Sequence, residues 1–199
     1  MLRRLYLGFA LLFLAGCAGQ DVRDSTAPSW EEHRNSLQLL SHWNARGKLA
    51  LRTSERAESA TILWRQQGEN TELHLSGPIG LSATTIHSNG RQMEIRQGDE
   101  LRTIDISTPD AIALNTGWDL PLQALPYWLK GIPAPGSEVQ LLELDPDNDL
   151  LLHLQQDDWD VHYKKYEQFG GLTLPTQLQI QRGGTSVRMI IRNWQALPG

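Results

Sequence analysis

Apolar and polar residues alternate along most of the chain from Trp43 onward, which is the pattern of strands that bury one face. Glycine and asparagine between the runs, as at Asn89-Gly90 and Gly183-Gly184, suit tight hairpin turns, so neighbouring runs should pair antiparallel. The eleven runs are Trp43–Arg52, Ser59–Gln67, Thr71–Ser76, Ala83–Ser88, Gln92–Arg96, Leu101–Ile106, Glu138–Leu144, Leu150–Gln155, Trp159–Tyr166, Leu174–Arg182 and Ser186–Trp194. The pattern predicts a mostly β fold with about eleven antiparallel strands.

Helix signals interrupt this alternation at the start and in the middle of the chain. Ser29 and Glu32 have the spacing of a capping box, and Thr108 can cap a helix whose first residue is a proline. Gly131 is a C-terminal stop signal. The predicted helices are Trp30–His42, Pro109–Gly117 and Leu122–Lys130. We therefore expect a barrel-like sheet with a short helical lid inserted in mid-chain.

The N-terminus predicts a secretory signal. Arg3 and Arg4 precede the apolar run Leu5–Leu14, which is about half the roughly 20 residues that a transmembrane helix needs. Leu-Ala-Gly-Cys then ends at Cys17, the only cysteine, and resembles the lipobox of bacterial lipoproteins. That resemblance implies that residues 1–16 are a removed signal peptide and that Cys17 is acylated, which anchors the protein to a membrane. Ala18, where an aspartate would mark inner-membrane retention, then points to the outer membrane.

Length and charge narrow the remaining possibilities. Residues 17–28 are polar without a periodic pattern and read as a lipid-anchored tether, and residues 29–199 suffice for a single domain. The net charge of −5 argues against nucleic acid as a partner and against electrostatic adhesion to anionic lipid.

The sequence contains no motif typical of a catalytic or cofactor-binding site. There is no nucleophile elbow, phosphate-binding glycine loop or dinucleotide fingerprint. The six histidines lack the helical spacing of a zinc site and are expected to be scattered. The acidic run Asp145–Asp149 fails as a calcium loop, because the glycine position is occupied by Leu150. Asp157 and Asp158 are adjacent, and neighbouring strand residues point to opposite faces. We expect neither an enzyme nor a metal or other cofactor.

The apolar residues carry more information. Seven tryptophans are many for a domain of this size; most would belong to the core, but a curved sheet under a lid can also enclose a cavity. Ile62, Trp64 and Trp128 are our candidates for its wall. A second feature is the segment Ser76–Ser82, in which Pro78 and Gly80 flank Ile79. This segment predicts a loop whose isoleucine either folds back on the sheet edge or contacts acyl chains.

Several segments together resemble the LolB family of outer-membrane lipoproteins. The matching segments are Trp30 with its helix, Ala45–Gly47, Trp64–Gly68, Gly77–Gly80, Thr116-Gly117, Leu120–Leu122, Trp128–Pro133, Trp159 with Tyr163, and Asn193-Trp194. The resemblance implies an incomplete β-barrel with a helical lid over a hydrophobic cavity. It also implies that lipoprotein acyl chains arrive from the periplasmic carrier LolA and enter the outer membrane without nucleotide hydrolysis. Ile79 takes the place of an apolar loop residue, commonly leucine, that the family needs for insertion.

Other functions remain open from the residues alone. The main alternative is a scaffold or pilot lipoprotein that binds a protein partner and no lipid, and a lipoprotein hydrolase is a third. We expect a monomer that faces the periplasm of a Gram-negative bacterium.

Overall fold

The computed structural model describes residues 28–55, 57–77, 83–108, 111–116 and 121–198. Its strands are β1 (His42–Arg52), β2 (Ala57–Gln67), β3 (Asn70–Ser76), β4 (Thr84–Ser88), β5 (Gln92–Gln97), β6 (Glu100–Asp105), β7 (Val139–Leu144), β8 (Leu151–Gln156), β9 (Trp159–Phe169), β10 (Leu172–Arg182) and β11 (Thr185–Ala196). Its helices are α1 (Trp30–Leu39), α2 (Ala111–Thr116) and α3 (Leu125–Trp128). Each of the eleven predicted runs overlaps one strand, which confirms the predicted fold class.

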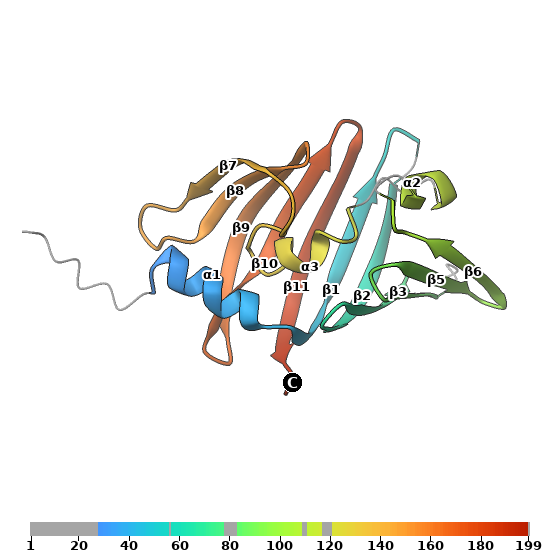
Figure 1. Cartoon of the computed structure of the whole chain (residues 1–199), viewed down its shortest axis with the longest axis horizontal. Helices are drawn as coiled ribbons and strands as arrows, with labels where there is room; N and C mark the ends of the chain where they lie inside the picture. Colours follow the sequence, from blue (N-terminus) through green and yellow to red (C-terminus); the bar gives the residue numbers. More distant parts are fainter. Residues whose placement is uncertain (1–27, 56, 78–82, 109–110, 117–120, 199) are drawn as a thin grey trace, which may run out of the picture.

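The strands form one antiparallel sheet in the order β6-β5-β4-β3-β2-β1-β11-β10-β9-β8-β7. Two meanders, β1–β6 and β7–β11, are joined where the first strand pairs with the last, so the two ends of the domain lie in the middle of the sheet. The sheet is strongly curved (Figure 1), and its edges β6 and β7 end it on opposite sides. The architecture is therefore an incomplete barrel.

The segment between β6 and β7 carries α2 and α3. Because its two ends belong to opposite edges of the sheet, this connection has to pass over one face of the sheet. Figure 1 shows α3 and α1 over the same face. None of the described helices is long and apolar enough to cross a membrane. Residues 107–108, 111–116 and 121–138 thus supply the lid that the sequence predicts.

The helices are shorter than predicted. α1 begins with the predicted capping box of Ser29 and Glu32 but ends at Leu39, because Leu40 leaves the helical conformation and His42 already pairs with Gln67 in the sheet. α3 spans only one turn, with Pro126 in its first turn, where the missing amide hydrogen leaves no partner unsatisfied.

The core contains a cluster of three tryptophans from the central strands. The ring centroid of Trp43 in β1 lies 5.9 Å from that of Trp64 in β2 and 5.0 Å from that of Trp194 in β11. All three side chains are at most 5% exposed. These contacts join the two meanders at their seam, where tilted aromatic pairs add to the free energy gained by burial.

Gly47 marks the closest approach of β1 to β11. The register between these strands shifts between Arg46 and Gly47, and a Cβ at position 47 would lie 2.1 Å from the carbonyl oxygen of Ile190. That oxygen belongs to the backbone of a central strand and has no room to move. Only glycine fits at this position.

Replacing Gly47 with alanine should therefore lower the free energy of unfolding by about 3 kcal/mol, since the seam has to open to admit a methyl group. Urea denaturation followed by tryptophan fluorescence measures the change. Gly184→Ala is the matched control, because a Cβ there meets nothing within 4 Å. Equal stability of the two variants would refute this account of the seam.

Candidate functional site

Two adjoining hollows lie between the sheet and its lid. The first has a volume of about 560 Å³ and is bounded by β1–β4, the end of α1 and the lid. The second has a volume of about 710 Å³ and is bounded by residues after β6, the lid and the β8–β9 turn. Four residues line both hollows: Ile106, Leu122, Gln123 and Tyr127. Both volumes fall in the range of roughly 300–1,000 Å³ that is typical of ligand pockets.

The wall of the first hollow is a row of apolar side chains across the sheet. Trp64, Leu73 and Ile86 occupy directly paired positions on β2, β3 and β4, and all three line the hollow. Paired residues point to the same face of a sheet, so the alternation in each strand places one apolar residue after another on this wall. Trp43 extends the wall onto β1. Trp64 thus lines the hollow, and its contact with acyl chains stays a prediction.

The indole of Trp64 is held by a polar network at the rim. Its Nε1 donates to Oε1 of Gln66 at 3.0 Å, and the Gln66 amide nitrogen donates to the Gly68 carbonyl at 2.8 Å. Thr71 also donates to Gln66 Oε1, at 2.8 Å. Because its only polar atom is paired within the protein, the ring of Trp64 presents hydrocarbon to the hollow.

The lid is fixed to the sheet by the fully buried Gln156 of β8. Its Oε1 accepts hydrogen bonds from Trp128 Nε1 and from the Ala134 amide, both at 2.9 Å. Its Nε2 donates to the carbonyls of Ala134 at 2.8 Å and Ser137 at 3.1 Å. The hydroxyl of Tyr163 adds a bond of 2.8 Å to the Trp128 carbonyl. One end of the lid is thereby attached to β8 and β9.

These attachments revise two expectations. Trp128 is fully buried, but it packs against Trp159 at 6.4 Å between ring centroids and anchors the lid instead of lining either hollow. Ile62 is also fully buried, and it too lines neither hollow. The sequence analysis missed the anchoring role of Gln156, although a glutamine two residues after Leu154 on the buried face of a strand was a usable signal.

Lys130 is one of three charged residues that line the first hollow, with Glu69 and Arg91. Its ammonium donates to the carbonyls of Leu37 at 2.7 Å and Leu40 at 2.9 Å, which are free at the end of α1. Burial lowers the pKa of Lys130 to about 8. The side chain thus joins α1 to the lid at the edge of the first hollow.

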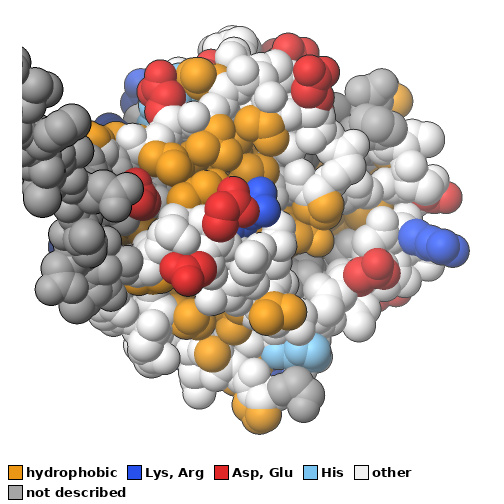
Figure 2. All heavy atoms as spheres, turned by 60° about the vertical axis from the view of Figure 1, so that its left-hand side comes forward, with side chains coloured by type: hydrophobic (Ala, Val, Ile, Leu, Met, Phe, Trp, Pro, Cys, Tyr) orange, Lys and Arg blue, Asp and Glu red, His pale blue; other side chains and the backbone are white. Residues whose placement is uncertain are grey.

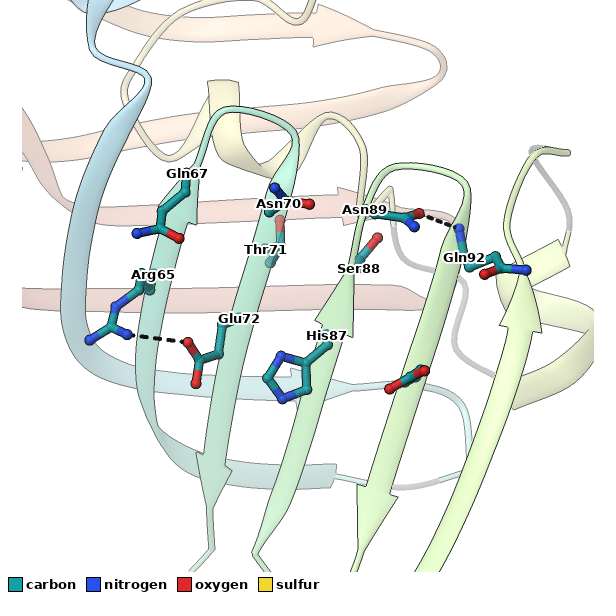
Figure 3. A pocket seen from close by; sticks show the side chains of 10 residues that line it. Arg65, Gln67, Asn70, Thr71, Glu72, His87, Ser88, Asn89 and Gln92 are labelled. Carbon is teal, nitrogen blue, oxygen red and sulfur yellow. Dashed lines mark hydrogen bonds and ion pairs between the residues drawn. The ribbon is translucent and has the colours of Figure 1, made fainter. Parts of the chain in front are cut away.

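A further, polar pocket lies on the outer side of the sheet. It has a volume of about 250 Å³, and Figure 3 shows its side chains on β2–β5, among them the ion pair of Arg65 with Glu72 at 3.4 Å. Its lining contains no large apolar side chain, so it does not suit a hydrocarbon ligand.

Apolar surface is also exposed near the hollows. Figure 2 shows hydrophobic side chains gathered among charged ones on one side of the molecule. Leu39, at the end of α1, is 84% exposed and Leu114 of α2 is 83% exposed. Each is close in sequence to residues that line a hollow, Leu40 for the first and Ile112 for the second. Cys17 and the loop residues Pro78, Ile79 and Gly80 lie outside the described residues.

Comparison with known proteins identifies the family to which this chain is similar. Residues 41–194 match the family described as "Outer membrane lipoprotein LolB". The chain is 37% identical over 199 residues to the outer-membrane lipoprotein LolB of Alkalilimnicola ehrlichii, covering 98% of both proteins, and 30% identical over 201 residues to that of Stutzerimonas stutzeri, covering 98% of this chain and 96% of that protein. Among solved structures, a LolA superfamily protein from Nitrosomonas europaea superposes with a TM-score of 0.54 at 10% identity, covering 86% of this chain and 96% of the other.

Loss of the Gln156 amide should loosen the lid. Gln156→Leu leaves Trp128 Nε1 and backbone groups of Ala134 and Ser137 without their partner, which we expect to lower the free energy of unfolding by about 3 kcal/mol. Hydrogen exchange should accelerate most at residues 128–137. Gln155→Leu, on the opposite face of the same strand, is the control. Unchanged exchange in Gln156→Leu would contradict the anchoring role.

Stability should depend on the titration of Lys130. Its pKa is about 8 in the fold and about 10.5 in the unfolded chain, so between these values the unfolded chain binds more protons. The stability that Lys130 contributes therefore rises from pH 8 toward pH 10, by up to ~1.4 kcal/mol per pH unit. Chemical denaturation of wild type and Lys130→Met at pH 7.5–10 tests this. The difference between the two curves should grow with pH; parallel curves would disprove it.

Proposed function

The chain belongs to the LolB family of outer-membrane lipoproteins, and from this we propose that it receives lipoproteins from the periplasmic carrier LolA and inserts them into the outer membrane. The observation that carries the proposal is the apolar wall of the first hollow, formed by Trp43, Trp64, Leu73 and Ile86 beneath the lid. Acyl chains of the incoming lipoprotein bind against this wall. No covalent chemistry, cofactor or nucleotide is required for the step.

Energetics supports a direct transfer from one cavity to another. Each methylene group exposed to water costs about 0.8 kcal/mol. Releasing the two or three acyl chains of a lipoprotein into the periplasm would therefore cost tens of kcal/mol. A tighter-binding acceptor removes chains from the carrier without exposing them. The bilayer is a better solvent for acyl chains than the hollow, so their transfer from the acceptor to the membrane lowers the free energy.

The lid is suited to this exchange because one of its ends is anchored to the sheet. Gln156 and Tyr163 hold the segment from Trp128 to Ser137 on β8 and β9. Among the described residues closer to β6, Gln123 donates to the Ile106 carbonyl at 3.2 Å. The first hollow lies beneath residues 122–130 of the lid, beside the Gln156 anchor, where an acyl chain can enter without displacing it.

Membrane attachment and insertion are assigned to two segments. Acylated Cys17 holds the protein on the periplasmic side of the outer membrane, and the polar residues 18–28 let the domain reach the carrier. The loop Pro78-Ile79-Gly80 connects β3 to β4, and Ile79 contacts the bilayer when the chains leave the hollow. The acceptor acts as a monomer.

Replacing Ile79 with glutamate should separate the two halves of the reaction. Chains should still leave the carrier, because the hollow is unchanged, but arrival in the membrane should slow ~100-fold, since a carboxylate in hydrocarbon costs about 3 kcal/mol. Release from LolA is measured by pull-down and arrival by flotation of liposomes that carry the lipidated acceptor.

Ile79→Leu is the control and should retain both steps. Wild-type arrival with Ile79→Glu would show that the loop does not insert lipoproteins. Failure of release with this variant would instead place Ile79 in carrier binding.

A further inference from the structure

Two of the six histidines meet on the outer face of the sheet, in contrast to the expected scatter. His153 of β8 and His162 of β9 are directly paired across the hairpin, and their rings stack with centroids 4.1 Å apart and planes inclined by 19°. The hairpin turn consists of Asp157 and Asp158, with φ angles of 52° and 61°. Two left-handed residues are typical of a type I′ turn, which fixes this pairing.

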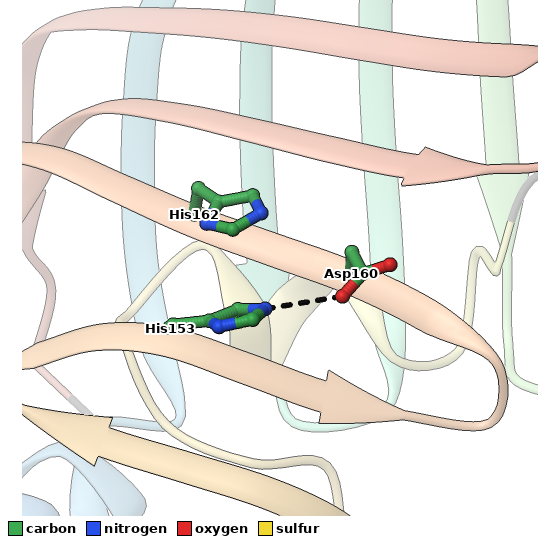
Figure 4. Close-up of side chains that lie close together, drawn as sticks. All are labelled: His153, Asp160 and His162. Carbon is green, nitrogen blue, oxygen red and sulfur yellow. Dashed lines mark hydrogen bonds and ion pairs between the residues drawn. The ribbon is translucent and has the colours of Figure 1, made fainter.

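Asp160 completes a group of three ligand-type side chains. Its Oδ1 lies 3.0 Å from His153 Nε2, and Figure 4 shows the carboxylate beside both imidazoles. One nitrogen or oxygen atom from each of the three residues lies within 4.8 Å of the others. All three side chains are half-buried, so the group is open to solvent on one side.

The strands hold this group in place. Asp160 and His162 are two residues apart on β9 and so face the same side, while His153 stands opposite His162 on the adjacent strand. Three donors on two paired strands need no loop to bring them together. The backbone of such a site is held on rigid elements, and only the side chains have to adjust.

Glu143 of β7 supplies a second carboxylate behind His153. It is paired with His153 in the sheet, and its Oε2 lies 3.5 Å from His153 Nδ1. Without an ion, the closer carboxylate of Asp160 holds a proton on Nε2. An ion that binds Nε2 displaces this proton to solvent, and Glu143 then favours the tautomer that carries the remaining proton on Nδ1. The two nitrogens of His153 thus face two different acids.

We propose that His153, Asp160 and His162 bind a transition-metal ion of the Zn²⁺ class, with water in the fourth position and Glu143 orienting His153. Zn²⁺ accepts imidazole nitrogen and carboxylate oxygen at about 2.0–2.2 Å in tetrahedral geometry. Tetrahedral ligand atoms at that distance are about 3.4 Å apart, so the side chains have to close in by about an ångström. Rotation about their χ angles suffices on an open face.

The charge of the surroundings also suits a cation. The bound cation would lie among the carboxylates of Asp160 and Glu143.

The site is separate from the acyl-chain hollows. None of its four residues lines either hollow, because they occupy the opposite face of the sheet from Val161 and Trp159. An ion there would link β8 to β9 next to the open edge formed by β7. Its expected effect is to stiffen this edge.

The test uses the full mature chain, purified in detergent without a histidine tag. Co²⁺ added to the wild type should give the visible absorption bands of a tetrahedral complex, and Zn²⁺ should abolish them at a 1:1 ratio. A Zn²⁺ concentration 100-fold above Kd should raise Tm by about 5–10 °C. Absence of the Co²⁺ bands in the folded wild type would overturn the proposal.

Variants locate the site. His153→Asn and His162→Gln should each weaken Zn²⁺ binding at least ~100-fold, and Glu143→Gln about 10-fold. His74→Gln is the matched control, because His74 also contacts a strand carboxylate, Glu72 at 2.8 Å, yet belongs to no group of three ligands among the described residues. Binding that survives in His162→Gln, or is lost in His74→Gln, would refute the assignment.

Discussion

The connection from β6 to β7 has to cross a face of the sheet, because these two strands are its opposite edges. The interior of the molecule depends on this constraint. A lid that crosses a curved sheet can touch it closely only in some places. Here it touches at β8 and β9, where Gln156 forms four hydrogen bonds with Trp128, Ala134 and Ser137. Elsewhere the lid and sheet leave the two hollows between them.

The lid is therefore anchored at one end and lies over the two hollows along the rest of its described length. A buried amide with all its bonds made is costly to remove, so the anchored end of the lid keeps its position when the hollow fills or empties. The wall of the first hollow offers tryptophan and aliphatic side chains, and the indole nitrogen of Trp64 is paired within the protein. Lys130 closes its edge by bonding the last carbonyls of α1. Apolar cargo can therefore bind without rearranging the core.

Local patterns were sufficient to predict the strands, because most of them bury one face and alternate accordingly. They also predicted Trp64 as part of the wall. The same patterns could not separate Trp64 from Trp128, since both are apolar and fully buried; only the hydrogen bond of Trp128 to Gln156, 28 residues away, decides between wall and anchor. The pairing of His153 with His162 was predictable in principle, because both are equally distant from the Asp157-Asp158 turn, but its turn type was not recognised.

Capture of acyl chains inside the first hollow is the central claim, and site-specific photo-crosslinking during transfer tests it most directly. A crosslinker at Leu73, in the wall, should attach to the acyl chains of a lipoprotein supplied by LolA. One at Leu152, which is 39% exposed on β8 and lines neither hollow, should not. Crosslinks to acyl chains at Leu152 but not at Leu73 would contradict the account.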